Sequence, residues 1–176
     1  MAAYRILPSP LGPLLLAALP AGLCWCDWSD GPLRSALASL GERFCADFRD
    51  DSRDESHALA DTAEQLEAYF TGQRQTFRLP CVTQGSPFER RVWDAMSAIP
   101  YGRRASYGAI AAIAGSPRAV RATGRACGAN PLSIIVPCHR VVGADGRLTG
   151  YAGGLRRKQW LLDHEQHYAA AAEHAG

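Results

Sequence analysis

The chain has 176 residues, of which 47% are hydrophobic, enough for one domain with a full core or for two small domains that share an interface. No stretch reaches the ~20 apolar residues that a membrane-spanning helix needs, which excludes such a helix. The formal net charge is only +2. It is unevenly placed, because residues 87–160 hold 12 basic and 3 acidic side chains. This basic segment indicates a polyanionic partner.

The apolar stretch at residues 11–23 resembles either the core of a secretory signal or a pair of strands. Two prolines interrupt it, and no small-x-small cleavage site follows. We therefore expect strands near Arg5, at 14–19 and at 23–28, with a turn at 20–22. Without a signal peptide, a cytoplasmic location is expected. Free thiols are then expected at all six cysteines: Cys24, Cys26, Cys45, Cys81, Cys127 and Cys138.

Two helices follow in the first part of the chain. Apolar residues recur every three or four positions within 32–44 and again within 57–70, a spacing that fits one helical face. Residues 76–82 are expected to be extended, and the charge balance changes sign soon afterwards. The sequence thus predicts an α+β protein with one domain at 1–85 and a second at 86–176.

The second part is predicted to be mostly helical. The Ser-Pro pair at 86–87 supplies an N-cap and a first-turn proline for a helix that extends to residue 100. Ser106 caps a short helix that ends at Gly115, and a further helix is expected over 116–128. Two helices joined by a glycine turn form the outline of a helix-turn-helix DNA-binding unit.

That outline also occurs in ordinary helix packing, but the second helix carries an arginine ridge. Arg118, Arg121 and Arg125 lie at i, i+3 and i+7, within about 60° of one another around a helix. Small residues such as Ala122 keep the rest of this helix slim. A slim helix with an arginine ridge favours contact with a nucleic acid.

A short apolar run at 134–136, consistent with a buried strand, leads to Cys138. A cysteine attacks well only when a nearby cation or base supplies its thiolate, and His139 and the arginine after it are the local groups. Neighbours on a strand point to opposite faces, so His139 needs a turn or an intervening water to act on Cys138. A histidine base also needs an orienting partner, and both Asp163 and Glu165 qualify.

The residues around Pro-Cys-His-Arg, from 135 to 143, closely resemble the O6-alkylguanine-DNA alkyltransferase family, also called methylated-DNA–protein-cysteine methyltransferases. The runs 150–154 and 158–165 resemble it as well. Upstream matches, in order and spacing, are 88–93, 99–102, 106–107 and 129–131. The resemblance is dense over 86–165 and thinner at the N-terminus, where 9–14 fits the opening strand of the family.

This resemblance implies a ribonuclease-H-like α/β domain, packed on a mostly helical helix-turn-helix domain that carries the active-site cysteine. It implies repair by direct reversal, in which Cys138 takes the alkyl group once and irreversibly from O6-alkylguanine. O4-alkylthymine would react less well. The damaged base would be flipped out of double-stranded DNA, approached from the minor-groove side. The resemblance implies a monomer with no cofactor and no obligate protein partner. The residues themselves offer no four-ligand metal set and no membrane span, so neither a metal nor a membrane is expected.

The resemblance also implies roles for individual residues. His139 would accept the thiol proton through a water while Glu165 holds the imidazole. Asn130 would connect the turn before the active-site segment to the loop around it. Tyr107 would crowd the phosphate so that the base swings out, and would protonate the departing guanine at N3. Arg121 would fill the gap in the duplex. Further DNA contacts are expected from Arg118, Arg125 and Ala122, and a guanine pocket from Val141, Tyr151, Ala152 and Gly153.

Three other interpretations stay open. A DNA-binding regulator would not depend on Cys138. A cysteine hydrolase using Cys138 and His139 would turn over many substrates, and it would need an oxyanion hole that the sequence does not reveal. A zinc site built from these two residues with His164 and His167 matches no common ligand spacing. Cys24 and Cys26, in the expected strand at 23–28, leave zinc two ligands short and favour core packing.

Overall fold

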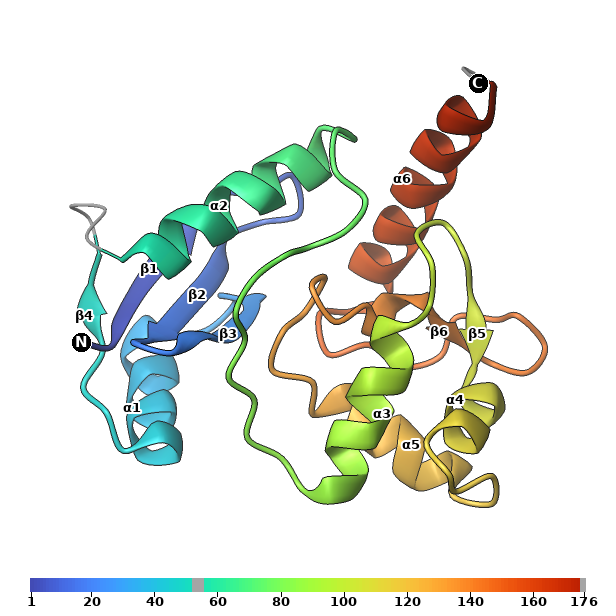
Figure 1. The fold of residues 1–176 in the computed structure, drawn as a ribbon, viewed down its shortest axis with the longest axis horizontal. Helices are drawn as coiled ribbons and strands as arrows, with labels where there is room; N and C mark the ends of the chain where they lie inside the picture. Colours follow the sequence, from blue (N-terminus) through green and yellow to red (C-terminus); the bar gives the residue numbers. More distant parts are fainter. Residues whose placement is uncertain (52–55, 175–176) are drawn as a thin grey trace. The chain divides into compact units, whose positions relative to one another are not determined.

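The structure is a computed structural model that describes residues 1–51 and 56–174, with side chains as far as residue 170. The chain divides into two compact units, residues 1–83 and 84–176 (Figure 1). Among the described residues, no helix combines the length and the apolar composition that crossing a bilayer requires.

The first unit is built on a four-stranded sheet in the order β3-β2-β1-β4. Strand β2 (Leu14–Leu19) pairs antiparallel with both β1 (Ala3–Leu7) and β3 (Gly22–Trp28), which confirms the predicted strands and hairpin. The short β4 (Arg49–Asp50) adds a parallel edge beside β1. It was not predicted, because two exposed polar residues carry no strand pattern.

Helices α1 (Leu33–Phe44) and α2 (His57–Phe70) cover the two faces of this sheet (Figure 1) and confirm the predicted helices. The core on one face includes Leu40 and Phe44 of α1 against Leu15 of β2. Burying each large apolar side chain contributes about 2 kcal/mol. The segment expected to be extended before residue 83 forms no strand. It makes only a single parallel bridge, between Leu23 and Cys81.

The second unit is mostly helical. Its helices are α3 (Pro87–Ser97), α4 (Tyr107–Ile113), α5 (Val120–Gly128) and α6 (Leu155–His174). The only sheet described in it is a parallel pair of two-residue strands, β5 (Ala105–Ser106) and β6 (Val141–Val142).

The predicted helix starts of α3 and α4 are confirmed by their caps. The Ser86 hydroxyl accepts from the Glu89 amide at 3.3 Å while the Glu89 carboxylate accepts from the Ser86 amide at 2.7 Å, a complete capping box. Ser106 accepts from the Ala109 amide at 3.1 Å. Such caps stabilise a helix by about 1 kcal/mol each.

Two sequence predictions in this unit are wrong. Helix α5 begins at Val120, so Arg118 lies in the preceding turn and the ridge on the helix keeps only Arg121 and Arg125. The buried run before Cys138 is a turn rather than a strand. Ile134 has a positive φ of 73°, which no strand residue adopts.

Candidate active site

Cys138 opens a one-turn 3-10 helix, Cys138–Arg140, and its side chain is buried. Adjacent residues on a strand would point to opposite faces. Because Cys138 and His139 lie on a 3-10 helix, this restriction does not apply to them. The amide of Cys138 donates to the carbonyl of Val136 at 2.8 Å, which tightens the approach to the helix. The cysteine is therefore presented by a compact buried turn.

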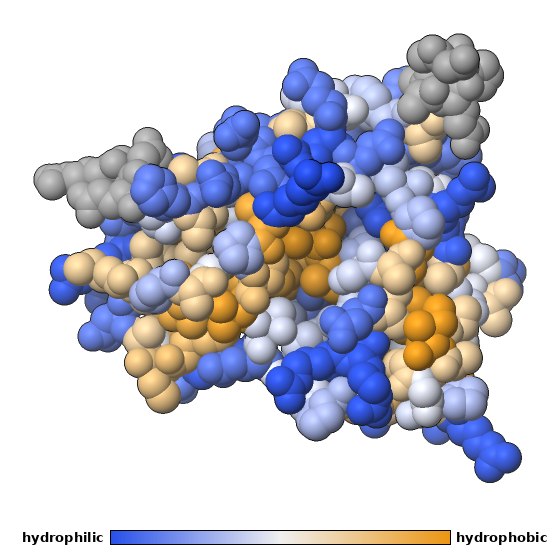
Figure 2. Space-filling view, in the orientation of Figure 1, coloured by the Kyte–Doolittle hydropathy of each residue, from blue (hydrophilic) through white to orange (hydrophobic). Residues whose placement is uncertain are grey.

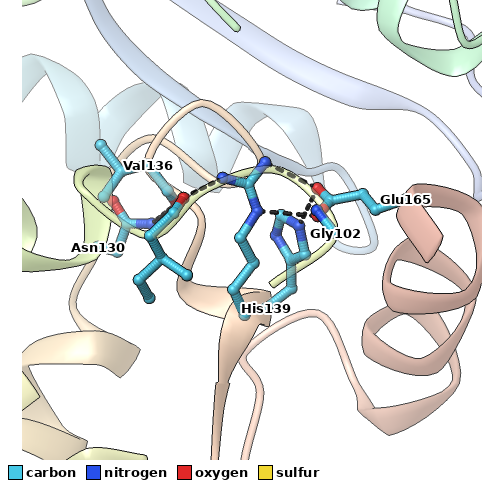
Figure 3. Close-up of polar contacts among 7 residues, drawn as sticks. Gly102, Asn130, Val136, His139 and Glu165 are labelled. Carbon is cyan, nitrogen blue, oxygen red and sulfur yellow. Dashed lines mark hydrogen bonds and ion pairs between the residues drawn. The ribbon is translucent and has the colours of Figure 1, made fainter. Parts of the chain in front are cut away.

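Asn130 connects this turn to the sulfur. Its Nδ2 donates to the Val136 carbonyl at 2.9 Å (Figure 3). The same Nδ2 donates to Cys138 Sγ at 3.2 Å, and Oδ1 accepts from the Leu132 amide at 3.0 Å. The side chain is buried, so these contacts are shielded from water. A hydrogen bond donated to sulfur stabilises negative charge on it, and Asn130 thus favours the reactive thiolate.

A buried polar cluster lies behind the cysteine. Glu165 reaches from α6 toward His139 and the backbone of Gly102 (Figure 3). One carboxylate oxygen lies 2.7 Å from His139 Nε2 and accepts from Arg140 Nη2 at 2.9 Å. The other accepts from Arg140 Nε at 2.8 Å and from the Gly102 amide at 3.1 Å. A single carboxylate therefore orients the histidine and neutralises the buried arginine.

The charges of this cluster follow from its contacts. Burial alone would raise the pKa of Glu165, but the hydrogen bonds and charges of His139 and Arg140 outweigh it and hold that pKa at about 2. Burial lowers the pKa of His139, against the opposing effect of Glu165. Glu165 is thus ionised and His139 neutral at neutral pH.

This arrangement also fixes the histidine tautomer. Because the ionised carboxylate can only accept, His139 Nε2 carries the proton and Nδ1 presents its lone pair. Nδ1 is buried and contacts no hydrogen-bonding group among the described protein atoms. The imidazole is therefore set to accept a proton at Nδ1.

A pocket of about 140 Å³ opens beside Cys138. Its lining residues are Tyr107, Gly124, Cys127, Gly128, Cys138, Gly150, Tyr151 and Ala152. The pocket brings Tyr107, Tyr151 and Ala152 together with the cysteine, as the resemblance implied. Val141, buried in β6, and Gly153 are not among the lining residues.

Tyr107 is the first residue of α4, and its ring lies beside Gly124 of α5. A Cβ on Gly124 would lie 3.9 Å from the tyrosine ring. The Tyr107 hydroxyl donates to the carbonyl of Thr149 at 3.0 Å. Burial raises the pKa of Tyr107, so the phenol keeps its proton at neutral pH.

A second thiol, Cys127, lines the same pocket. Burial, followed by the neighbouring Cys138, raises the pKa of Cys127 to about 12. Cys127 is therefore a protonated thiol and a poor nucleophile. The pocket distinguishes its two cysteines, because only Cys138 receives the Asn130 hydrogen bond.

The expected DNA-contacting residues lie on the helix-turn-helix surface. Arg118, Arg121 and Arg125 are exposed, whereas Ala122 is half-buried. Ile113 and Val120 at the turn between the helices are exposed by 65% and 42%. The face of the molecule seen in Figure 2 carries both hydrophilic and apolar residues. Exposed arginines can bind the phosphates of a DNA backbone, and exposed apolar side chains can contact the sugars beside them.

Sequence reasoning missed three residues of the site: Cys127, Thr149 and Lys158. Cys127 could have been found, since it lies two residues after Arg125 on the same helix. The carbonyl of Thr149 and the burial of Lys158 give no sequence signal, because both depend on where a loop folds back.

The comparisons with known proteins agree with this geometry. Residues 2–82 match the family described as "6-O-methylguanine DNA methyltransferase, ribonuclease-like domain", and residues 87–167 match "6-O-methylguanine DNA methyltransferase, DNA binding domain". These matches confirm the ribonuclease-like first half and the helical second half that the resemblance implied.

Individual relatives cover nearly the whole chain. The methylated-DNA–protein-cysteine methyltransferase of Methanosarcina barkeri is 42% identical over 93% of this chain and 96% of its own length. The protein of that name from Mycolicibacterium paratuberculosis is 42% identical over 98% of this chain and 97% of its own. The crystal structure of Mycobacterium tuberculosis OGT in complex with DNA has a TM-score of 0.80, with 40% identity and 94% of each chain covered. The chain therefore belongs to the 6-O-methylguanine DNA methyltransferase family.

Proposed function

We propose that this protein repairs alkylated DNA by transferring the alkyl group from O6 of guanine to Cys138 Sγ. The observation that carries the proposal is the position of Cys138, a buried thiol that receives a hydrogen bond on its sulfur and borders a pocket of about 140 Å³. The family to which the chain belongs supports the same reaction, and O4-alkylthymine is a secondary substrate.

The transfer is a displacement at carbon. The thiol proton of Cys138 passes through a water to His139 Nδ1, and Glu165 stabilises the imidazolium that forms. The bond from Sγ to the alkyl carbon then forms while the bond from that carbon to O6 breaks. The electron pair stays on the guanine, and Tyr107 donates a proton to N3, so that the base leaves neutral.

A stacked base cannot present O6 to a protein thiol in line with the carbon–oxygen bond, so the damaged base must leave the duplex. We propose that α5 enters the minor groove and that Arg121 fills the gap in the base stack. Arg118, Arg125 and the backbone at Ala122 then contact phosphates on either side. Residues 86–176 would therefore carry both DNA binding and transfer, in a monomer.

The product is a thioether, which is stable under physiological conditions. Neither a metal nor a cofactor takes part in the proposed step. One protein molecule should therefore accept one alkyl group. This stoichiometry distinguishes the proposal from a cysteine hydrolase, which would turn over many substrates, and from a DNA-binding regulator, which would accept none.

A single-turnover assay tests the proposal. The protein is mixed with duplex DNA carrying one O6-methylguanine with a tritiated methyl group, and protein-bound tritium is counted. We expect transfer to stop at one equivalent. Cys138→Ser should abolish transfer yet keep lesion binding, while Cys127→Ser, in the same pocket, should retain transfer. Transfer by Cys138→Ser, or continued release of product beyond one equivalent, would contradict the proposal.

A further inference from the structure

Trp93 of α3 makes a buried hydrogen bond that the proposed mechanism does not use. Its indole Nε1 donates to the carbonyl of Ala126 at 2.9 Å, and both residues are buried. Ala126 lies in the last turn of α5, where the backbone carbonyls lose their regular helical partners. A buried indole N–H requires an acceptor. Here the acceptor is the end of the helix that leads to the active site.

The end of α5 determines where Asn130 lies. The helix ends at Gly128, and the Asn130 amide donates back to the carbonyl of Cys127 at 3.4 Å. From this position the side-chain Nδ2 of Asn130 reaches Cys138 Sγ at 3.2 Å. Because Cys138 lies on a different element, a displacement of the end of α5 would move the donor away from a sulfur that stays in place.

The tryptophan ring is also held on its other side. Gly85 approaches the ring so closely that a Cβ at this position would lie 2.5 Å from Cη2 of Trp93. The capping box formed by Ser86 and Glu89 fixes the start of α3 next to this contact. The ring therefore has little room to turn, and its N–H stays directed at the carbonyl of Ala126.

A second side chain of α3 makes a similar contact with the other helix of the helix-turn-helix. Helix α3 packs against both α4 and α5. Arg91 Nε donates to the carbonyl of Ala114, the C-cap of α4, at 3.0 Å. Helix α3 thus donates a side-chain N–H to the C-terminal end of each helix. Of these two contacts, the one from Trp93 lies on the helix that leads to Asn130.

We propose that Trp93 is a positioning residue for alkyl transfer, whose indole N–H fixes the end of α5 and thereby keeps Asn130 Nδ2 on Cys138 Sγ. This inference rests on the proposed function of Cys138. Trp93 is not among the residues that line the pocket, so it acts through Asn130. Loss of the indole N–H should therefore make the thiolate of Cys138 less favourable and leave the pocket lining unchanged.

Charged and titratable groups on the elements around Cys138 also affect its thiolate. They are Tyr107 of α4, Cys127 of α5, Lys158 and Glu165 of α6, and His139 and Arg140 of its own turn. Every variant in the test below keeps all six groups. A change in thiolate formation therefore reports the hydrogen bond on the sulfur.

The test compares Trp93→Phe, Trp93→Leu, Asn130→Ala and the combination of Trp93→Phe with Asn130→Ala with the wild type. The rate of Cys138 alkylation by iodoacetamide is followed against pH by peptide mass spectrometry, and the reaction with free O6-benzylguanine is timed separately. Arg91→Met is the matched control, because it removes the contact of α3 with the end of α4 instead of α5. Thermal unfolding shows that each variant is folded at the temperature of the assays.

We expect Trp93→Phe and Trp93→Leu to move the alkylation profile toward higher pH by about half a unit, and to slow the benzylguanine reaction about threefold at neutral pH. Asn130→Ala should shift the profile further, by about one unit. The combined variant should match Asn130→Ala alone, because the tryptophan acts through the hydrogen bond that Asn130→Ala has already removed. Arg91→Met should keep the wild-type profile.

A wild-type profile in the two Trp93 variants would overturn the inference; if only one of them folds, its profile decides. A combined variant whose shift is the sum of the two single shifts would overturn it as well, and so would an equal shift in Arg91→Met. Thiol labelling requires no DNA repair, so a wild type that labels normally but never accepts a benzyl group would contradict the proposed function instead.

Discussion

Glu165 is the residue on which the buried polar cluster depends. Its two oxygens accept from His139, Arg140 and the Gly102 amide. The carboxylate fixes the histidine tautomer and compensates a buried guanidinium. Among the residues near Cys138, it is the one whose loss affects both the proton acceptor and the stability of the fold.

Glu165→Gln tests this double role. The variant retains an amide oxygen but turns an NH2 group toward Arg140 or His139, which leaves a buried cation uncompensated. We expect the reaction with O6-benzylguanine to slow by about 100-fold and the free energy of unfolding to fall by about 3 kcal/mol. Single-turnover kinetics and urea unfolding measure the two effects. Glu64→Gln, on the exposed face of α2, should change neither; a near-normal rate for Glu165→Gln would remove Glu165 from the proton path.

The same residues predict how stability depends on pH. The pKa of His139 is lowered by burial, and the pKa of Glu165 is about 2 because the hydrogen bonds and charges of His139 and Arg140 outweigh its burial. The unfolded chain therefore takes up both protons at higher pH than the folded protein. The contribution of His139 declines as pH falls below about 6.5, and that of Glu165 declines from about pH 4.5 toward pH 2.

Urea unfolding of the wild type and of Glu165→Gln measures this dependence. The difference between their free energies of unfolding should shrink as the pH is lowered from about 5 to about 3, because only the wild type loses the ionised carboxylate in that range. A difference that stays constant with pH would show that Glu165 is not held ionised by its neighbours.

Among the elements, those set by local signals were predictable and those set by distant contacts were not. The capping serines, the prolines and the 3.6-residue spacing predicted α1 to α4 closely. The two-residue strands β5 and β6 depend on a pairing across more than thirty residues and have no pattern of their own. The segment before Cys138 is predicted as a strand because a short apolar run is typical of a buried strand. Such a run does not distinguish a strand from a buried turn.

The turn before β5 depends on a glycine. Gly102 has a φ of 70°, and a Cβ there would lie 2.8 Å from the Cβ of Ala169 on α6. We expect Gly102→Ala to lower the free energy of unfolding by about 2 kcal/mol and to slow transfer, because the Gly102 amide would move away from Glu165. Thermal unfolding and benzylguanine kinetics test this. Gly108→Ala, in the helical backbone of α4, should leave stability unchanged or raise it slightly.

The proposed function assigns DNA recognition to α5 and the chemical step to Cys138. Arg121 is exposed on this helix and does not line the pocket beside Cys138. Arg121→Ala should therefore slow the reaction on duplex DNA by about tenfold or more, with little effect on free O6-benzylguanine. Arg78→Ala, an exposed arginine of the first unit, serves as the control on duplex. Equal losses on both substrates would refute the gap-filling role.

For the whole molecule, the charge distribution read from the sequence agrees with where the structure places the site. The basic segment 87–160 spans the helix-turn-helix, Cys138 and the start of α6. What the sequence could not show is which basic residues are buried. Arg140 and Lys158 are enclosed by the fold, while Arg118, Arg121 and Arg125 reach the surface. That distinction depends on tertiary packing. It separates the buried charges from the exposed charges to which the proposed function assigns DNA contact.

This separation predicts two different responses to salt. If three exposed arginines each neutralise one phosphate, the logarithm of the binding constant for undamaged duplex should fall with the logarithm of salt concentration with a slope of about −3. The rate with free O6-benzylguanine should hardly change, because the buried charges are poorly screened. Fluorescence anisotropy and single-turnover kinetics across a salt series test this. If the binding constant and the benzylguanine rate fell equally with salt, the exposed charges would take part in the chemical step.

The most direct test of the central claim is the intact mass of the protein after reaction with a slight excess of duplex carrying one O6-methylguanine, followed by peptide mapping. The account predicts one added methyl group per molecule, located on Cys138 and absent from Cys127, with unmodified guanine restored in the DNA. An unchanged mass with the duplex still bound, or a methyl group on any residue other than Cys138, would contradict it.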